Sequence, residues 1–477
     1  MGRGLIVLAA LCSTVSVASL SVVPAFGGTP TATSIEAPSP GDAASDPFVD
    51  FSAVACPAST SCVAVGSYST GLQQGLVDTL TNGTWTAVHA PLPPRDRAEP
   101  WLKKRKWEAR LQTLSCPAAG ACVAAGNFYP GSSFAPILIE RQRGPNWRAT
   151  EAPLPGNASS QLGAGIDSLV CPTKHSCVGV GGYETDTGGS DGLIETLTGD
   201  AWSAIEAPLP GPGYYQPQVS LSDVSCPEAG NCVAVGTYED ENAVDQAVIE
   251  TLAGGSWTAT LAPLPADADP TAAGPLSLLS CPAAGSCVAV GDYGDSEGPG
   301  HAYAETLSAD LWSPTDVPPP GSGDSAINWW DLTCPAVGVC FAPVDDADQN
   351  DAFHFAVGIL SDGNWTETPI PLPDGLDPAT HVSVLEHLVC HGVSFCVGTG
   401  FVGTDSDNLG TGLVATASDQ AWVSSEPPLP GNAVDGDHTA LTAVTCLDDT
   451  TCLLAGNYTD TMGNQQGLLV TVPDPGS

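Results

Sequence analysis

Apolar residues along this chain come in short runs separated by turns rich in Gly, Pro and Asn. Residues 221–265, LSDVSCPEAGNCVAVGTYEDENAVDQAVIETLAGGSWTATLAPLP, show the pattern. An apolar run leads to a first cysteine, a short turn to a Val-Ala-Val-Gly run, and a variable loop to a third run and a Gly-x-Trp turn. Runs of this length and composition, with no helix-length segment between them, predict β-strands. The segment therefore predicts four antiparallel strands, named a to d here in chain order.

This four-strand unit repeats along the chain. After Cys12, each of the 16 remaining cysteines belongs to a C-x5-C pair, and successive first cysteines are 53 to 60 residues apart. A fixed period of this size is typical of repeat architectures. The pairs are Cys56 and Cys62, Cys116 and Cys122, Cys171 and Cys177, Cys226 and Cys232, Cys281 and Cys287, Cys334 and Cys340, Cys390 and Cys396, and Cys446 and Cys452.

The repeats predict a ring. Four strands cannot bury both of their faces alone, so the units must stack, and radial stacking produces a β-propeller. The eighth repeat ends at QGLLVTVPDPGS without a Trp strand, whereas residues 31–40, TATSIEAPSP, resemble the fourth strand WTATLAPLP. We therefore expect an all-β fold, an eight-bladed propeller of four-stranded antiparallel blades whose last blade is closed by the N-terminal strand. A seven-bladed ring is the alternative.

The C-x5-C pairs are expected to form disulfides between strands a and b, across the turn that joins them. A loop this short stabilises the fold by roughly 2 kcal/mol per bridge in the chain-entropy model. Zinc binding is disfavoured, because the spacing exceeds the usual C-x2-4-C and no paired His or Cys recurs with it. Eight equivalent bridges also favour a structural role over redox catalysis.

Two further recurring residue types are expected to be structural. The Trp of strand d would pack blade against blade rather than serve as a ligand platform. The acids that recur in strand c are likewise assigned to the scaffold. The Trp residues are Trp85, Trp147, Trp202, Trp257, Trp312, Trp365 and Trp422, and the acids are Asp78, Glu140, Glu195, Glu250 and Glu305.

The order of an apolar strand, a turn, CVAVG, a third strand and a GGSW turn resembles secreted bacterial propellers with BNR-like or Kelch-like repeats. The resemblance covers nearly all of the chain after residue 27 and implies an architecture, since such propellers include enzymes, adhesins and scaffolds. The sialidase-type Asp-box, S-x-D-x-G-x-x-W, is matched only in part, in the residues SDGNW at 361–365. The arginine cluster of that family has no counterpart, because no Lys or Arg follows Lys174.

Residues 1–27, MGRGLIVLAALCSTVSVASLSVVPAFG, combine a basic start, a long apolar run and a small-residue exit, as secretory signal peptides do. We expect residues 28–477 to form a single propeller domain that is secreted and extracellular, where disulfides persist. Lipid attachment at Cys12 and retention of the apolar run as an anchor are alternatives. No later segment is long and apolar enough to span a bilayer.

Charge narrows the choice of partner. Removal of residues 1–27 leaves 11 basic and 53 acidic residues, a net charge of −42. Such a surface repels nucleic acid and anionic membranes, and it suits cationic partners or metal ions. The positive charge that remains is concentrated in a basic insert at residues 94–110, between the first two repeats.

The sequence of that insert suggests a docking segment. Pro100 could begin a short helix, with the pairs Glu99/Lys103 and Lys104/Glu108 at helical spacing and Trp107 packing down together with Leu111. We expect it to dock on the acidic face of its own propeller or of a second copy; contact with an anionic wall polymer is the rival. The partner-binding candidates are Lys103, Lys104, Arg105 and Lys106.

Function is expected on the face that carries the b–c and d–a loops, because variable loops on a rigid scaffold are the usual place for binding. The b–c loops are acidic, and the sharpest candidate is the loop of the sixth repeat. Its Val344 replaces a Gly found in the other seven repeats, and a run of carboxylate and amide side chains follows that could bind Ca²⁺. The metal candidates are Asp346, Asp348, Asn350 and Asp351.

No catalytic signature is present, and the one histidine cluster, His381, His387 and His391 with Glu386, is a weak metal or catalytic candidate. We expect a noncatalytic binding or surface-interaction module whose partner is an extracellular protein or glycan. An extracellular glycan-active enzyme with a site at the mouth of the central channel is the alternative. A purely structural envelope component is the third possibility.

Overall fold

The computed structural model describes residues 31–94, 107–129, 135–211, 219–266, 268–269, 273–294, 301–319, 327–347, 353–378, 380–404, 407–418, 421–434 and 438–474. The expected signal peptide, Lys103, Lys104, Arg105 and Lys106, and Asp348, Asn350 and Asp351 lie outside these residues. Every element of the described chain is a β-strand. No helix long and apolar enough to cross a membrane occurs in this part of the chain.

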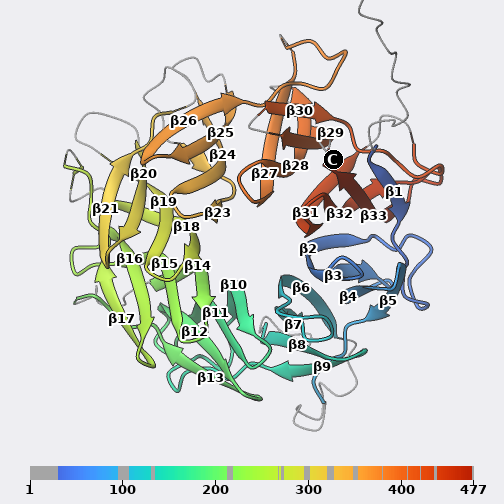
Figure 1. The fold of residues 1–477 in the computed structure, drawn as a ribbon. Helices are drawn as coiled ribbons and strands as arrows, with labels where there is room; N and C mark the ends of the chain where they lie inside the picture. The colour runs from blue at the N-terminus through green and yellow to red at the C-terminus, as the bar shows by residue number, and fades with distance from the viewer. Residues whose placement is uncertain are drawn as a thin grey trace, which may run out of the picture.

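Eight antiparallel sheets are arranged in a ring around a common centre (Figure 1). Blade 1 contains β2 (Asp50–Ala58), β3 (Ser61–Ser69), β4 (Gln73–Thr81) and β5 (Thr84–His89). Blade 2 contains β6 (Glu108–Ser115), β7 (Val123–Tyr129), β8 (Ile137–Arg143) and β9 (Asn146–Glu151). Blade 3 contains β10 (Ala164–Thr173), β11 (Ser176–Glu184), β12 (Ser190–Thr198) and β13 (Ala201–Glu206). Blade 4 contains β14 (Val219–Glu228), β15 (Asn231–Glu239), β16 (Asp245–Ala253) and β17 (Ser256–Leu261).

The ring continues through the second half of the chain. Blade 5 contains β18 (Ala273–Ala283), β19 (Ser286–Tyr293), β20 (His301–Ser308) and β21 (Leu311–Asp316). Blade 6 contains β22 (Asn328–Trp329), β23 (Thr333–Ala336), β24 (Val339–Ala347), β25 (Phe353–Ser361) and β26 (Asn364–Pro369). Blade 7 contains β27 (Val382–His391), β28 (Phe395–Thr404), β29 (Asp407–Ser418) and β30 (Ala421–Ser425). Blade 8 contains β31 (Thr439–Asp448), β32 (Thr451–Thr459), β33 (Gln465–Pro473) and β1 (Thr33–Glu36).

The N-terminal strand closes the ring. β1 pairs antiparallel with β33, from Thr33 opposite Thr471 to Glu36 opposite Leu468. The Ala37 N–H extends the pairing by donating to the Gly467 carbonyl at 2.8 Å. The eight-bladed prediction and the closure by residues near 31–40 are confirmed, and the seven-bladed alternative is wrong.

The core lies between blades, as the recurring Trp residues predicted. Eight clusters of buried apolar side chains each combine residues of two neighbouring blades. Each of the seven strand-d Trp residues belongs to a different cluster, and Ala32, just before β1, belongs to the eighth. Burial of these aromatic rings therefore holds the ring of blades together.

All eight expected disulfides are present. Seven join strand a to strand b of one blade, and that of blade 2 joins Cys116, just after β6, to Cys122, just before β7. Their Cα atoms are 3.8 to 4.1 Å apart. In blades 7 and 8 the two cysteines are direct partners in the strand register. The disulfide prediction is confirmed.

A β-bulge in strand a explains the Gly that follows most C-x5-C pairs by four residues. In blade 4 the register of β14 with β15 shifts between Leu221 and Asp223, so that Ser222 is the extra residue. A Cβ on Gly236, in β15, would overlap the Ser220 carbonyl oxygen of the bulged strand. The same overlap would arise at Gly66, Gly126, Gly181, Gly291, Gly400 and Gly456. Gly is required because the bulge brings two backbones together.

Blade 6 is the exception, and its Val344 now has a backbone explanation. Strand a is divided into β22 and β23, and Trp329 pairs with Val344 in β24. Without the close backbone approach, the position opposite strand a tolerates a side chain. The Trp330 N–H donates to the Pro343 carbonyl at 3.2 Å across the break. The presence of Val rather than Gly at position 344 is therefore explained by the division of strand a.

The C-terminal end of the basic insert is a strand, so the helical spacing expected to reach Glu108 does not apply there. Residues 108–115 form β6, and Arg110 lies within it. Trp107 is buried and stacks on Phe128, with ring centroids 5.3 Å apart. Leu111 is fully buried in the same cluster. The expected packing of Trp107 and Leu111 is confirmed, whereas the helix fails at 108–111 because these residues complete the inner strand of blade 2.

Candidate functional site

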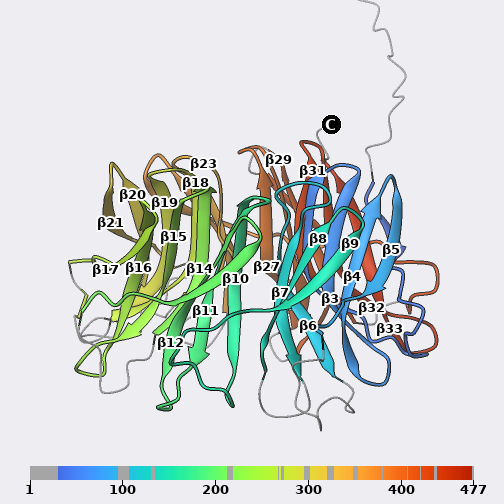
Figure 2. The same cartoon turned by 90° about the horizontal axis from the view of Figure 1, so that it is seen from below.

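The two faces of the propeller differ in their connections. The a–b and c–d turns are short and lie on one face, the turn face, while the b–c and d–a loops lie on the other, the loop face (Figure 2). The described b–c loops of blades 3 and 4 carry Glu184, Asp186 and Asp191, and Glu239, Asp240, Glu241 and Asp245. The acidic character expected of the loop face is therefore present in these two blades.

A cavity of about 530 Å³ opens on the loop face between blades 3 and 4. The inner strands β10 and β14 supply its channel side, through Gly165, Asp167 and Ser220. The ends of strands b and c supply the rest: Tyr183, Glu184, Ser190, Thr237 and Asp245. The lining combines three carboxylates with hydroxyl groups.

The charges of this cavity are set by local contacts. The Glu184 carboxylate accepts a hydrogen bond from the Ser190 hydroxyl at 3.0 Å. Asp167, the bulge residue of β10, has a pKa raised by burial. Asp167 and Asp245 have no hydrogen bond or ion pair to a cation in the described residues, so these side chains remain available to a cationic ligand.

Tyr183 fixes the position of the d–a loop beside the cavity. Its hydroxyl donates to the Asn157 side-chain oxygen at 2.9 Å. The Asn157 amide in turn donates to Glu206 at 3.0 Å and to Asp191 at 3.3 Å. Burial, together with the charge of Glu206, raises the pKa of Asp191. Blade 8 repeats the arrangement, since the Tyr458 hydroxyl donates to Glu36 and to Asn432.

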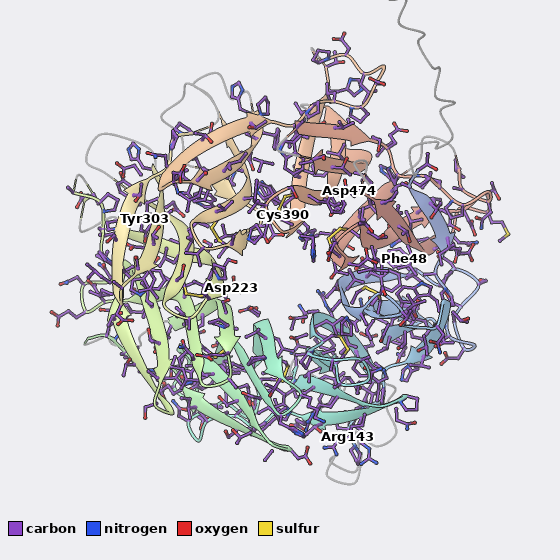
Figure 3. All side chains as sticks on the ribbon, in the orientation of Figure 1. Phe48, Arg143, Asp223, Tyr303, Cys390 and Asp474 are labelled. Carbon is purple, nitrogen blue, oxygen red and sulfur yellow. A yellow bond between two sulfur atoms is a disulfide. The ribbon has the colours of Figure 1, made fainter. Side chains whose placement is uncertain are left out.

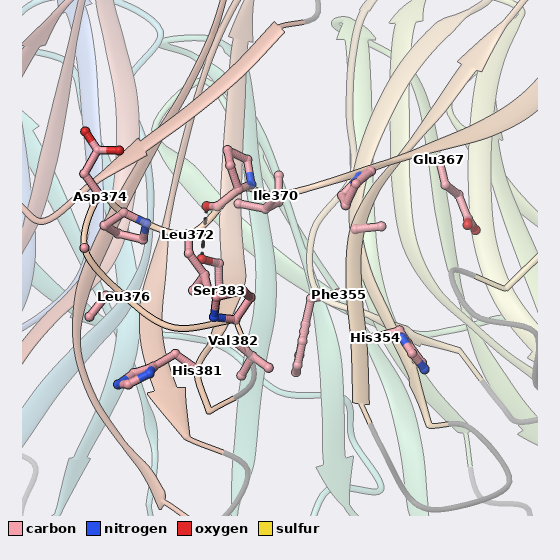
Figure 4. Close-up of a pocket in the computed structure, with 16 residues that line it drawn as sticks. His354, Phe355, Glu367, Ile370, Leu372, Asp374, Leu376, His381, Val382 and Ser383 are labelled. Carbon is pink, nitrogen blue, oxygen red and sulfur yellow. Dashed lines mark hydrogen bonds between the residues drawn. The ribbon is translucent and has the colours of Figure 1, made fainter.

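A second loop-face cavity, of about 810 Å³, lies between blades 6 and 7 (Figure 4). Its lining combines apolar residues such as Phe355, Ile370 and Leu372 with the carboxylates Glu367 and Asp374, and His354 and His381 lie toward the edge. The Ser383 hydroxyl donates to the Pro371 carbonyl at 3.2 Å and anchors the proline-rich connection. This cavity thus has two carboxylates, one fewer than the first cavity, beside its apolar residues.

The histidine cluster of the sequence is not assembled into a metal site. His381 precedes β27 and lines the second cavity, whereas His391 ends β27 and lies 2.8 Å from Asp449 on the turn face. His387 lies between them, and burial lowers its pKa. Among the described residues no group of three potential metal ligands converges. These histidines are close in sequence, but the extended strand places them far apart in space.

The calcium candidates of blade 6 stay a prediction. Asp348, Asn350 and Asp351 lie outside the described residues, and only the backbone of Asp346 is described. Its neighbour Asp345 is buried and accepts hydrogen bonds from the Asn328 amide at 3.0 Å and from the Trp330 indole. Asp345 therefore holds the divided strand a in place.

Two carboxylates at the central channel serve as clamps between blades. Asp223 accepts hydrogen bonds from the Ser168 hydroxyl of blade 3 at 2.7 Å and from the Leu279 N–H of blade 5 at 2.8 Å, and it lies at the inner rim in Figure 3. Asp331 accepts from the Leu388 N–H of blade 7 at 2.8 Å. Burial raises the pKa of both to about 6. Their oxygens are engaged by the scaffold, which leaves them unsuited to acid–base chemistry on a substrate.

The strand-c acids have a property that the sequence did not reveal. Asp78, Glu140, Glu195, Glu250 and Glu305 are fully buried, and none of their carboxyl oxygens has a hydrogen-bond partner in the described structure. Burial raises the pKa of Glu140 to about 9, and those of Glu195, Glu250 and Glu305 to about 8. Burial also raises the pKa of Asp78. The four glutamates are therefore mainly protonated near pH 7.

Comparison with known proteins yields only distant structural similarity. No protein-family model and no curated protein matches the chain. A Trypanosoma rangeli sialidase in complex with sialic acid is similar at 11% identity, over 81% of this chain and 55% of that one, with a TM-score of 0.36. A Mycobacterium tuberculosis puromycin-hydrolyzing peptidase is similar at 11% identity, over 84% and 57%, with a TM-score of 0.44. A Hadza microbial sialidase is similar at 10% identity, over 84% and 73%, with a TM-score of 0.37.

The chain thus spans about half the length of the first two of these proteins. At such scores the likeness carries no argument about activity. The propeller architecture rests on the sheet topology of the chain itself. Function has to be argued from the surfaces that this chain presents.

Proposed function

We propose that this protein is a noncatalytic extracellular binding module that takes a positively charged partner on the loop face of blades 3 and 4. The partner would be a protein or glycan that carries amino groups. Eight disulfides in an all-β propeller fit an extracellular protein. The proposal concerns binding, since the clamped carboxylates at the channel are engaged by the scaffold.

The observation that carries the proposal is the cavity between blades 3 and 4. Asp167, Glu184 and Asp245 line it together with hydroxyl groups that can accept hydrogen bonds from an ammonium group. No Lys or Arg follows Lys174 in the sequence, so blades 4 to 8 offer no cation of their own to neutralise these acids. A cleft lined by one sign of charge concentrates ligands of the opposite sign and raises their rate of association.

The test is calorimetric titration of the oxidised chain with a lysine pentapeptide, at low and at high NaCl. We expect binding that weakens with salt, and a loss of at least about fivefold in affinity in the double variant Glu184→Gln, Asp245→Asn. The control is Asp310→Asn, Asp362→Asn, which removes two exposed acids from the c–d turns on the other face. Equal weakening in both variants would mean that net charge, rather than this cavity, binds the peptide.

A glycan-active enzyme is the second candidate, and one observation favours it. Glu386 is the bulge residue of β27 on the inner rim, and burial raises its pKa. An acid with a raised pKa suits protonation of a glycosidic oxygen. Turnover of chromogenic glycosides that disappears in Glu386→Gln would support this candidate and contradict the noncatalytic proposal.

A further inference from the structure

A groove on the turn face has the opposite charge to the rest of the molecule. It lies between blades 2 and 3, has a volume of about 820 Å³, and is lined by Arg141, Arg143, Arg148, Asp200 and Trp202 among others. Arg143 lies at the outer rim of the propeller (Figure 3). The groove is therefore remote from the central channel, where the strands a lie.

The strand register brings the three guanidinium groups together. Arg141 and Arg143 are two residues apart in β8, so their side chains leave the same face of the sheet. Arg148, in the neighbouring strand β9, is the direct partner of Arg141. Like charges at directly opposed positions repel each other, so this arrangement disfavours the unliganded hairpin.

The chain neutralises these charges only in part. Arg141, whose side chain is 13% exposed, donates to the Asp200 carboxylate at 3.3 Å and to the Lys174 and Gly199 carbonyls. Arg143 donates to the same oxygen of Asp200 at 2.7 Å. Arg148 is exposed and makes no hydrogen bond or ion pair within the described residues. One carboxylate oxygen of Asp200 thus accepts from two arginines, and the third arginine has no carboxylate partner.

The surroundings add further positive charge. Lys174 and His175 form the exposed a–b turn of blade 3, next to the groove. Glu151, at the end of β9, is the second carboxylate of the lining. Arg141, Arg143, Arg148 and Lys174 against Asp200 and Glu151 make a local excess of two positive charges, in a chain whose net charge is −41.

We infer that this groove is a second binding site, which takes a tetrahedral oxyanion, a phosphate or sulfate group, between Arg143 and Arg148. Guanidinium groups bind such anions through paired N–H donors, and Arg148 has its donors free of described partners. The acidic remainder of the surface repels extended anions, so only a compact, doubly charged group gains enough from the local arginines. This site goes beyond the cation-binding proposal, because it lies on the opposite face and has the opposite sign.

The experiment is calorimetric titration of the oxidised chain with inorganic phosphate at constant ionic strength. The double variant Arg143→Gln, Arg148→Gln changes two exposed side chains and should bind phosphate at least about tenfold more weakly than the unaltered chain. The control Arg110→Gln removes a cation from β6, on the inner rim, and should leave the affinity unchanged. Melting curves establish that both variants fold.

Three results would overturn the inference: absence of phosphate binding at millimolar concentration, equal affinity in the double variant, or loss of binding only when Lys103, Lys104, Arg105 and Lys106 are changed to Gln. Retained phosphate binding in Glu184→Gln, Asp245→Asn would separate this site from the loop-face proposal.

A parallel titration with dextran sulfate, and with dextran as the uncharged control, identifies the source of the anion. Binding of dextran sulfate that is equal to or weaker than that of inorganic sulfate, counted per sulfate group, supports a compact free anion as the ligand. Tighter binding of the polymer would contradict the preference of this groove for a compact anion.

Discussion

The buried acid Glu250 should make the propeller less stable as the pH rises, and Glu250→Gln should remove that loss. Glu250 is fully buried between blades, neither carboxyl oxygen has a partner, and burial raises its pKa from 4.5 to about 8. Between these two values the folded chain keeps a proton that the unfolded chain has released. The free energy of unfolding therefore falls as the pH rises from about 4.5 to about 8.

The magnitude follows from the width of that interval. From pH 4.5 to pH 7 the two states differ over roughly 2.5 pH units, and at about 1.4 kcal/mol per unit this amounts to an upper value of about 3 kcal/mol. For a domain of about 450 residues with an unfolding entropy of ~2.1 cal/mol/K per residue, 3 kcal/mol corresponds to about 3 °C in melting temperature. Gln preserves the shape and polarity of the side chain and cannot ionise.

The assay is thermal unfolding of the oxidised chain at pH 4.5, 5.5 and 7. The Glu250→Gln variant should melt with the unaltered chain at pH 4.5 and about 3 °C above it at pH 7. The control Glu228→Gln removes an exposed acid from the a–b turn of the same blade and should not change the pH profile in this way. A Glu250→Gln variant with the pH profile of the unaltered chain, or with a lower melting temperature at pH 7, would refute the account of the buried acids.

Three further predictions concern the scaffold. Gly236→Ala should lower the melting temperature markedly, because its Cβ would overlap the Ser220 carbonyl, whereas Gly156→Ala, with open space around it, should not; equal melting of the two variants would contradict the bulge explanation. Replacing Cys226 and Cys232 together by Ser should cost about 2 kcal/mol in urea unfolding, and no change would mean that the bridge adds nothing to the fold. Deleting residues 28–37 should expose β33 and promote self-association in sedimentation experiments, because an unpaired edge recruits strands; a stable monomer would count against closure by β1.

The sequence predicted the fold in detail because its signals are repeated. Spacing of the C-x5-C pairs established the period, and the likeness of residues 31–40 to a strand d established how the ring closes. Each signal recurs in blade after blade, so a single irregular blade does not obscure it. The turn at Gly363 and the packing role of the strand-d Trp were likewise predictable, because a positive φ favours Gly and a large buried gap between blades favours a large ring.

Val344 shows where the prediction needed the structure. The loss of Gly at this position was interpreted as part of a metal loop. In the structure, the backbone of strand a opposite this position determines whether Gly is required. In the other blades this Gly is required because a bulge brings strand a close to its backbone, whereas in blade 6 strand a is divided. No feature of residue 344 alone carries this information, because the close contact joins backbones that are about 15 residues apart in each repeat.

The sequence predicted on which face the loop-face site lies, but not which side chains converge in either site. The acidic loops were expected on one face, yet the cavity between blades 3 and 4 also depends on Asp167, which the bulge of β10 brings to the same place. The three arginines were visible in the sequence only as scattered charges. Their convergence depends on the register of β8 with β9 and on the position of the neighbouring c–d turn.

Hydrogen exchange of the oxidised chain, with and without the lysine pentapeptide, tests the proposed loop-face site most directly. Binding in the cavity between blades 3 and 4 should slow exchange in residues 184–190 and 239–245, which form the b–c loops beside it. Exchange in the turn-face residues 174–175 and 199–200 should be unchanged. Slowing confined to those turns, or no slowing in either b–c loop under conditions where the peptide is bound, would contradict the proposed binding site.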